Sequence, residues 1–384
     1  MSLKNKMKVW HIWDFPESVY VFLKDNFREE FFNEMFKKCA GIRPYARYLG
    51  VNQMTIKNYF KGHTYKRGIK HKQSIPLTLF RKSLNLMTED LKKKVEDNIV
   101  SIKLKNRGLE IKDVELPFRE SPDFYRAVAH ILCDGSSSDK SGAYYANTCK
   151  ELREEFKRDL NVFGNMKIYE IKPQDVTIVC FPKVLARTLA HILKIRFTYP
   201  DHLPKDIFNA SNGCKAAFLR AVFDDEGTIS TNLAVGMFNR NLIEEIKSLL
   251  GFFNIETTLT SIKKSDKWQD NYSFNVKTKY FSKFDEIIGF TSEDKAKKLK
   301  LAVNTRQRMV RTRPKALIEE QIIKILEAKP SKTIEIANSV ELTLGYLSKF
   351  LGQMEEEGKI VKSGFSNNLK WSLPMDATND THNS

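Results

Sequence analysis

Two acidic dipeptides, Asp134-Gly135 and Glu226-Gly227, each end a mostly apolar segment with the periodicity of a helix. The two acids lie 92 residues apart. Two carboxylates held close together repel each other, and a divalent cation relieves that repulsion. Hard oxygen ligands suit Mg²⁺, which keeps several waters and bridges to phosphate oxygens. Because such a metal polarises a phosphodiester and activates a water, these residues predict metal-assisted hydrolysis.

The segments around the two acids repeat one order of elements. Residues 123–135 and 217–227 share an Arg-Ala-Val sequence and small residues, which predicts two helices packed closely along a pseudo-two-fold axis. Alternating and helical patterns then predict helix, two strands, helix, two strands and helix in both copies. The predicted strands include 143–149, 166–172 and 176–181 in the first copy and 233–238, 257–262 and 272–278 in the second.

The paired acid-Gly helices, their spacing and the strand order resemble the LAGLIDADG (dodecapeptide) homing endonucleases in their single-chain, two-repeat form. Two further blocks, Leu203–Ala210 and Ile287–Phe290 followed by Lys295, are also similar to this family, and the resemblance covers about residues 99–302. It implies an α+β fold of two pseudo-symmetric αββαββα repeats that form a DNA-binding saddle. One departure is Leu132, which stands where the family often has another acid.

The resemblance implies roles for particular residues. Asp134 and Glu226 would hold Mg²⁺, with one carboxylate serving each DNA strand, and Gly135 and Gly227 would allow the sharp exit from each helix. Lys277 and Lys295 are the candidate basic residues at the scissile phosphates, and the choice between them stays open. Asp224 and Asp225 are secondary candidates for metal coordination, whereas His130 is interpreted as a packing or hydrogen-bonding residue.

The strands offer polar residues to a DNA groove in every second position. The residues expected to face DNA include Lys167, Tyr169, Lys172, Thr177, Thr258, Thr260, Lys263, Ser273, Asn275 and Lys277. The residues expected to face the helices are Ile168, Ile171, Ile178, Leu259, Ile262, Phe274 and Val276.

Residues 42–62 show the spacing of a helix-turn-helix, with small Ala46 in the first helix, Gly50 in the turn and Ile56 in the second helix. A basic loop without acids follows over 61–72. The residues expected to contact DNA are Asn52, Gln53, Thr55, Lys57, Asn58, Lys61, Lys66, Arg67 and Lys70. A small helical hairpin of another kind is the alternative, because the pattern is short.

Three predicted helices and a hairpin resemble a winged helix-turn-helix near the C-terminal end, with Leu344, Leu347, Leu351 and Met354 toward its core. Winged helices bind DNA or protein, and both roles stay open here. The expected organisation is an N-terminal helical domain, repeat 1 with its lead-in, repeat 2, a basic linker, the winged helix and a flexible tail, over residues 1–98, 99–211, 212–302, 303–315, 316–374 and 375–384.

Charge and composition fit a partner that is a polyanion. The chain has 384 residues with a net charge of +17, of which residues 1–119 carry +12. Lysines and arginines that neutralise phosphates release counterions, which favours binding to nucleic acid. The five scattered cysteines contain no CxxC pair, which indicates a reducing cytoplasm rather than a disulfide framework or a zinc site. No apolar run reaches the length of a membrane span.

We therefore expect a monomer with pseudo-two-fold symmetry that cuts double-stranded DNA at a specific site with Mg²⁺. The alternative is a DNA-binding transcription regulator on a LAGLIDADG scaffold without cleavage activity, and a role in RNA splicing is a third possibility. The acids Asp134 and Glu226 discriminate between them, because a scaffold kept only for binding has no physical need for both.

Overall fold

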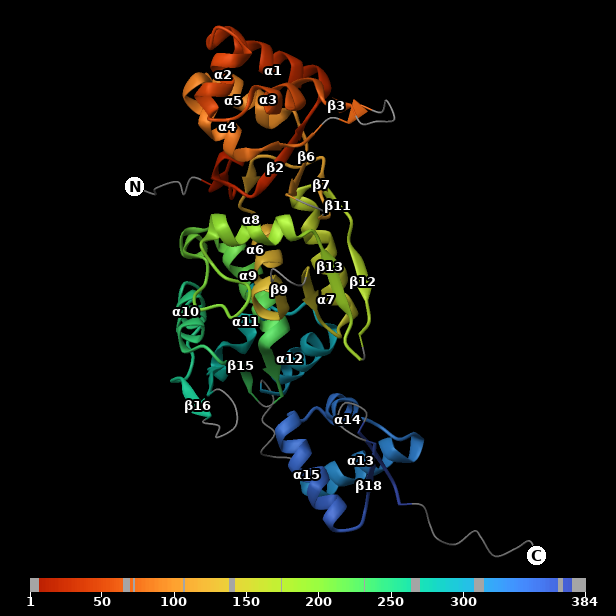
Figure 1. The fold of residues 1–384 in the computed structure, drawn as a ribbon. Helices are drawn as coiled ribbons and strands as arrows, with labels where there is room; N and C mark the ends of the chain where they lie inside the picture. Colours follow the sequence, from red (N-terminus) through yellow and green to blue (C-terminus); the bar gives the residue numbers. More distant parts are fainter. Residues whose placement is uncertain are drawn as a thin grey trace, which may run out of the picture. The chain divides into compact units, whose positions relative to one another are not determined.

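The computed structural model describes residues 7–64, 70–71, 73–105, 108–137, 142–173, 175–230, 232–263, 270–306, 314–364 and 369–374. The chain forms two compact units, and Figure 1 labels their helices and strands. Unit 1 contains residues 1–225 and 239–249, and unit 2 contains residues 226–238 and 250–384. No helix among the described residues is long and apolar enough to cross a membrane.

The N-terminal part of unit 1 is built from helices and short strands. Its helices are η1 (Ile12–Asp14), α1 (Asp25–Lys38), α2 (Ile42–Leu49), α3 (Gln53–Lys61), α4 (Leu77–Ser83), η2 (Leu84–Leu86) and α5 (Glu89–Asp97). Its strands are β1 (Val9–Trp10), β2 (Val19–Leu23), β3 (His63–Thr64), β4 (Lys70–His71), β5 (Ile75–Pro76), β6 (Ile99–Leu104), β7 (Ile111–Lys112) and β8 (Phe118–Arg119).

One sheet crosses the boundary expected at residue 98. It has five strands in the order β11-β7-β6-β2-β5, and β2 pairs antiparallel with β6. The inward residues of β2, Val19 and Val21, are fully buried. Residues 7–98 thus contain strands as well as helices, and β2 takes one of its two hydrogen-bonded neighbours, β6, from the following segment.

The rest of unit 1 includes two long helices, α6 (Pro122–Asp134) and α9 (Asn212–Glu226, whose last residue belongs to unit 2). Between them lie β9 (Gly135–Ser137), β10 (Ala143–Ala146), α7 (Lys150–Asp159), η3 (Leu160–Phe163), β11 (Asn165–Met166), β12 (Tyr169–Ile171), β13 (Ile178–Phe181), α8 (Lys183–Leu193) and η4 (Lys205–Asn209). Helix α10 spans Arg240–Gly251, and its residues through Leu249 belong to this unit.

Helices α6 and α9 are buried on nearly all sides. Every residue of α6 from Ala127 to Leu132 is buried, and so is every residue of α9 from Ala221 to Asp224. A helix that is apolar all round belongs in the centre of a core. At the start of α6, Phe124 stacks on Trp10 with ring centroids 4.9 Å apart, which ties the helix to the N-terminal segment.

Unit 2 begins with a four-stranded sheet. Its elements are β14 (Gly227–Ile229), β15 (Leu233–Met237), β16 (Ser261–Lys263), β17 (Asn271–Val276), η5 (Thr278–Tyr280), α11 (Phe281–Ile287) and α12 (Glu293–Arg306). The strand order is β14-β15-β17-β16, and the sheet of unit 1 that follows α6 has the order β9-β10-β13-β12. Each sheet thus begins with a short strand directly after an acid, and the next strand along the chain pairs with it. In both sheets the last strand along the chain then lies between that strand and the edge strand that precedes it in the sequence.

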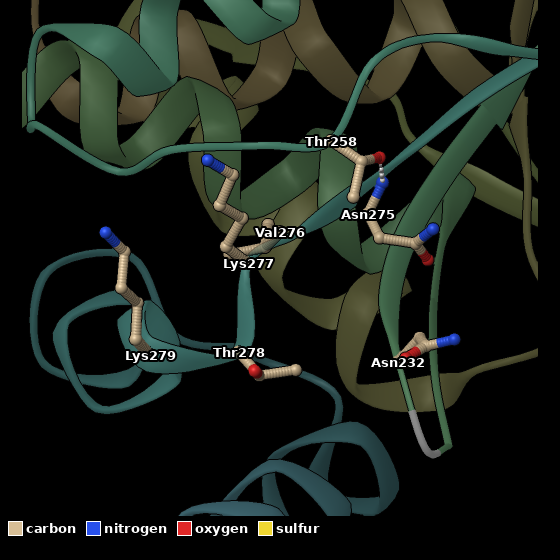
Figure 2. A pocket seen from close by; sticks show the side chains of 7 residues that line it. All are labelled: Asn232, Thr258, Asn275, Val276, Lys277, Thr278 and Lys279. Atoms are coloured by element: carbon tan, nitrogen blue, oxygen red, sulfur yellow. Dashed lines mark hydrogen bonds between the residues drawn. The ribbon is translucent and has the colours of Figure 1, made fainter.

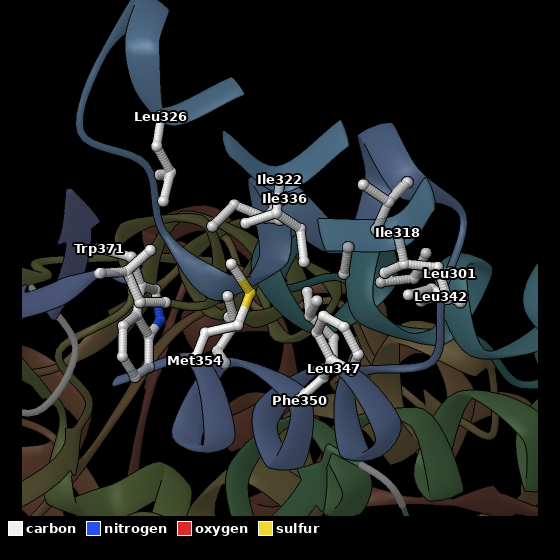
Figure 3. Close-up of a cluster of buried hydrophobic side chains, with 14 residues drawn as sticks. Leu301, Ile318, Ile322, Leu326, Ile336, Leu342, Leu347, Phe350, Met354 and Trp371 are labelled. Atoms are coloured by element: carbon white, nitrogen blue, oxygen red, sulfur yellow. The ribbon is translucent and has the colours of Figure 1, made fainter. Parts of the chain in front are cut away.

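The C-terminal part of unit 2 contains α13 (Lys315–Ala328), α14 (Thr333–Val340), α15 (Leu344–Glu356) and the hairpin β18 (Val361–Ser363) with β19 (Lys370–Ser372). Its core includes Leu347, Leu351, Met354 and Trp371, together with Leu301 from α12 (Figure 3). The inward positions predicted for Leu347, Leu351 and Met354 are confirmed. The expected flexible tail, 375–384, lies outside the described residues, as does most of the basic linker.

Candidate functional site

Helix α6 carries Asp134 to the start of a sheet. Ser121 begins the helix, because its hydroxyl accepts a hydrogen bond from Phe124 N at 3.1 Å and Pro122 occupies the first turn. Gly135 follows Asp134 and enters β9 without a loop. A Cβ atom at Gly135 would lie 2.4 Å from the carbonyl oxygen of Ile131, so the chain can turn out of the helix here only with a glycine.

A polar cluster surrounds the end of α6. Asn147, one residue after β10, donates from Nδ2 to Asp134 Oδ2 at 3.1 Å and to Asp225 Oδ1 at 3.1 Å. Tyr145 donates from its hydroxyl to Asp225 Oδ1 at 2.8 Å, and His130 Nδ1 lies 2.8 Å from Asp225 Oδ2. The fold therefore brings the secondary candidate Asp225 beside the first acid, and it makes His130 a hydrogen-bonding residue.

The contact between His130 and Asp225 joins α6 to α9, and both side chains are fully buried. Burial by itself lowers the pKa of His130, but the carboxylates of Asp225 and Glu155 outweigh burial and raise the pKa to about 10. The imidazole is therefore protonated at neutral pH and compensates the charge of Asp225. Burial and the Asp225 carboxylate raise the pKa of Tyr145, which stays a neutral donor.

An ion-pair network continues from His130 along α6. Glu155 of α7 lies 3.8 Å from His130 Nε2 and 3.4 Å from Arg126 Nε. Arg126 also contacts both carboxylate oxygens of Asp159, at 2.7 and 2.5 Å. Burial raises the pKa of Asp159 to about 6, although the Arg126 guanidinium opposes the shift. Charged groups thus connect the middle of α6 with its acidic end.

The second acid, Glu226, ends α9, and Gly227 begins β14. Lys295 of α12 donates from Nζ to the carbonyl oxygen of Gly227 at 2.6 Å. Of the two candidate lysines, Lys295 is therefore the one held at the residue that follows the second acid.

Lys277 lies elsewhere in unit 2, at the end of β17. It donates to Glu256 Oε2 at 2.7 Å, and Lys279 and Tyr280 contact the other oxygen of the same carboxylate. The hydrogen bonds from Lys277, Tyr280 and Lys279 lower the pKa of Glu256 to about 2. Lys277 and Lys279 line an open pocket of about 430 Å³ with Asn232, Thr258 and Asn275. Figure 2 shows both ammonium groups on the same side, away from the two asparagines.

The two outer strands do not follow the predicted inward and outward phases. Phe274 and Val276 of the inner strand β17 are buried as expected. Ile171, Leu259 and Ile262 were expected to face helices, but they are 46%, 90% and 50% exposed. That expectation is wrong for Ile171 and Ile262 because they lie in the edge strands β12 and β16, whose residues are all exposed. It is wrong for Leu259 because this residue precedes β16 and belongs to no strand. Lys167, Lys172 and Lys263 are exposed, and Asn275 is partly buried.

In the N-terminal region, α2 and α3 meet at Gly50, which has a φ of 70°. Ala46, Leu49 and Ile56 are buried between the helices. Asn52 caps α3 by accepting from Met54 N at 2.7 Å, and Gln53 Oε1 accepts from Arg43 at 3.1 Å, so both polar groups have local partners. The exposed positions on this helix include Lys57 and Lys61, while Thr55 and Asn58 are half-buried. Lys66, Arg67 and the side chain of Lys70 lie outside the described residues.

Hard oxygen donors at the end of α6 fit a cation such as Mg²⁺. Asp134 and Asp225 contact one and the same amide group. Across the described ranges, no group of three or more His, Cys, Asp and Glu residues is placed to hold a metal. Mg²⁺ needs only one or two carboxylates when waters and phosphate oxygens complete its coordination. Waters, and phosphate oxygens when DNA is bound, would complete the coordination of a cation held here.

Sequence reasoning missed Asn147 and Tyr145. A signal for Asn147 was present, since Asn147 and Asn239 differ by the same 92 residues that separate the two acids. Each precedes a helix and accepts a hydrogen bond from the backbone nitrogen two residues on, at 2.9 Å from Cys149 and 2.8 Å from Asn241.

Comparison with known proteins identifies one domain. Residues 213–289, about a fifth of the chain, match the family model described as LAGLIDADG-like domain. This region contains α9, the sheet β14-β15-β17-β16 and α11. Glutamine--fructose-6-phosphate aminotransferase [isomerizing] of Methanocaldococcus jannaschii is 28% identical over 210 residues, which are 50% of this chain and 18% of the relative. A DNA polymerase of Thermococcus sp. is 23% identical over 242 residues, 56% of this chain and 14% of the relative. The chain thus spans less than a fifth of the length of these relatives.

Solved structures show partial likeness. The homing endonuclease I-DmoI in complex with DNA and Mn has a TM-score of 0.34 and 15% identity, covering 44% of this chain and 98% of that chain. Full-length DUF199/WhiA from Thermatoga maritima has a TM-score of 0.34 and 14% identity, covering 62% and 92%. The homing endonuclease I-WcaI bound to its DNA recognition sequence has a TM-score of 0.31 and 14% identity, covering 46% and 85%. Because these TM-scores are low, nothing about activity follows from them.

Proposed function

We propose that the chain is a site-specific endonuclease of the homing type, which hydrolyses both strands of double-stranded DNA with Mg²⁺. Asp134 and Glu226 are the proposed metal ligands, one for each strand. The observation that carries the proposal is the repeated junction at which a buried helix ends in an acid and a glycine starts an edge strand. The two four-stranded sheets with one strand order support a monomer with pseudo-two-fold symmetry.

Each group has a definite task in this proposal. A bound cation would supply charge that polarises the scissile phosphate and would activate a water. Asp134 and Glu226 hold the cation, and Lys295, fixed at the residue after Glu226, is the better candidate for the lysine that approaches a phosphate in the second half. The exposed lysines Lys167, Lys172 and Lys263 bind the DNA backbone, and Asn275 is a candidate for contact with base edges.

The curated relatives also support an independent module. The two relatives are named for an amino transfer and for DNA polymerisation, reactions without common chemistry, and each match covers about half of this chain. Segments that match proteins of such different names are not expected to carry out either reaction. A nuclease module with its own substrate is consistent with that distribution.

Selection followed by cleavage tests the proposal. The full chain selects binding sites from random double-stranded DNA, and the selected sites are incubated with protein and Mg²⁺. We expect double-strand cuts with short overhangs. Asp134→Asn and Glu226→Gln abolish cutting but leave the binding affinity within about twofold, because each change keeps the shape of the side chain. If the parent protein binds the selected DNA but never cuts it, the proposal of an endonuclease is contradicted.

A transcription regulator without cleavage activity is the second candidate. The observation that favours it is the pair of helical modules outside the two sheets, α2–α3 with the Gly50 turn and α13–α15 with the hairpin β18–β19. Binding to the selected sites without any cutting supports this candidate over the first.

A further inference from the structure

The side chain of Asn147 is held at both ends. Its Nδ2 donates to Asp134 and to Asp225 at 3.1 Å each, and its Oδ1 accepts from the backbone nitrogen of Cys149 at 2.9 Å. The amide has little freedom to rotate, because rotation would place its oxygen against a carboxylate. Asn147 therefore presents a fixed donor to the first acid.

Asp225 is the fixed point of this arrangement. It accepts hydrogen bonds from Tyr145 and Asn147 on Oδ1 and contacts His130 through Oδ2. Its side chain is fully buried, in the same helix as the second acid. A buried carboxylate with three partners from α6 and the β10 region has one orientation, so Asp225 determines where the Asn147 amide lies.

The second copy of the repeat lacks this arrangement. Asn239 lies 92 residues after Asn147 and makes the same turn at the start of a helix. Its Nδ2 donates to the carbonyl oxygen of Pro200 at 3.2 Å instead of to a carboxylate. The residue of the first copy that corresponds to Asp225 is Cys133, which is no carboxylate. The two equivalent asparagines thus have different partners.

We propose that Asp225 is a positioning residue for Asp134. Acting through Asn147, it holds the Asp134 carboxylate in the orientation in which that group binds a divalent cation. This inference rests on the proposed function for its role in DNA cleavage. Groups that orient a metal ligand typically change metal affinity or activity by about 10–100-fold when they are replaced.

Metal binding by the full chain tests the inference without any cleavage. Titration with Mn²⁺, followed by calorimetry, is compared in the parent protein and Asp134→Asn, and the difference defines the site at Asp134. Asn147→Ser keeps an oxygen that can start α7 but removes the bridging amide, so we expect about 10-fold weaker Mn²⁺ binding at that site. Asp225→Asn keeps shape and an acceptor but loses charge, so its effect has the same direction and is smaller.

Asn239→Ser is the matched control, because it makes the same change at the equivalent turn and removes no contact with an acid. We expect parent-like Mn²⁺ affinity, and melting curves establish that all variants are folded. Equal affinity of Asn147→Ser and the parent overturns the inference. So does a parent protein whose Mn²⁺ binding is unchanged by Asp134→Asn.

Cleavage gives a second readout. On a plasmid with the selected site, Asn147→Ser should cut one strand about 10-fold or more slowly and the other at the parent rate, so nicked plasmid accumulates. Equal slowing of both strands overturns the inference, because it indicates general damage. If the parent binds Mn²⁺ and Asn147→Ser weakens it, but the parent never cuts, the proposed function fails and the positioning role stands.

Discussion

Replacement of His130 by Leu removes the only positive charge that we assign to Asp225 and leaves a carboxylate buried in unit 1. The groups that face His130 are Asp225 from α9, Glu155 from α7 and Tyr145 from β10. Breaking a buried charge pair by removing one partner costs about 3–5 kcal/mol. The rise of the His130 pKa from 6.5 to about 10 corresponds to a comparable figure, roughly 5 kcal/mol.

The pH dependence of this loss has a definite sign. The pKa of His130 in the folded chain lies above its value in the unfolded chain, so its contribution to the free energy of unfolding is complete below about pH 6.5. It disappears as the pH rises toward about 10. His130→Leu therefore differs most from the parent protein at pH 6 and least near pH 10.

Urea denaturation at pH 6, 8 and 10, followed by circular dichroism, measures this difference. Comparison of parent and variant cancels the tyrosines, lysines and cysteines that titrate in the same range. Adding Asp225→Asn to His130→Leu should restore more than half of the lost free energy of unfolding at pH 6, because the buried charge is then gone. The reasoning is refuted if His130→Leu costs less than about 1 kcal/mol at pH 6. A loss of constant size from pH 6 to 10 refutes it as well.

Four further substitutions test the junction at Gly135 and the lysines of unit 2. Gly135→Ala places a Cβ atom 2.4 Å from a backbone oxygen, so we expect a loss of about 1–3 kcal/mol in a melting experiment, whereas Gly142→Ala, with open space around it, changes little. Lys295→Met should slow DNA cleavage about 100-fold at unchanged DNA affinity, whereas Lys277→Met should weaken DNA binding and leave the cleavage rate of bound DNA unchanged. Strand-resolved kinetics measure both effects. The reverse pattern contradicts the choice of Lys295 as the lysine that acts in cleavage. Glu256→Gln releases two lysines from a surface carboxylate, so we expect tighter DNA binding with a steeper salt dependence in fluorescence anisotropy, and unchanged affinity counts against a DNA contact at the pocket.

The periodicity of the sequence predicted the helices, whose hydrogen bonds join residues close together in the chain. The apolar periodicity before Asp134 and Glu226 predicted both central helices, and the stretch between the predicted strands 143–149 and 166–172 is helical, as α7 followed by η3. The strand expected over 166–172 is two strands in two sheets, because Met166 pairs with Ile111 and Tyr169 pairs with Cys180. No period-2 pattern contains that information, since partners distant in sequence decide the pairing.

The sequence also did not predict which strands lie at the edges of the sheets. Alternation of polar and apolar residues identifies an inward face only where something covers that face. Ile171 and Ile262 alternate correctly and are still exposed, because β12 and β16 end their sheets. Asn52 caps α3, and its contact with DNA stays a prediction, because the same residue types start helices and contact bases.

The sequence predicted the acids of the candidate site but not the residues that hydrogen-bond to them. The sequence singles out Asp134 and Glu226 because each precedes a glycine at the end of an apolar run, and their role as metal ligands stays a prediction. Asn147 and Tyr145 become meaningful only when β10 returns beside β9 and places them against α9. The repeated interval of 92 residues pointed to Asn147, but only the fold distinguishes its carboxylate contacts from the carbonyl contact of Asn239.

The position of the His130–Asp225 pair argues for a role beyond stability. Two largely buried helices hold an imidazolium and a carboxylate at their contact, where replacement by apolar side chains of similar volume is often neutral or stabilising. Positions that break the local rule of an apolar core are expected at functional sites. This pair adjoins the amide that contacts Asp134, and Asp225 immediately precedes Glu226. If the double replacement His130→Leu/Asp225→Asn is as stable as the parent but binds Mn²⁺ more weakly, the pair contributes to metal binding and not to the stability of the fold.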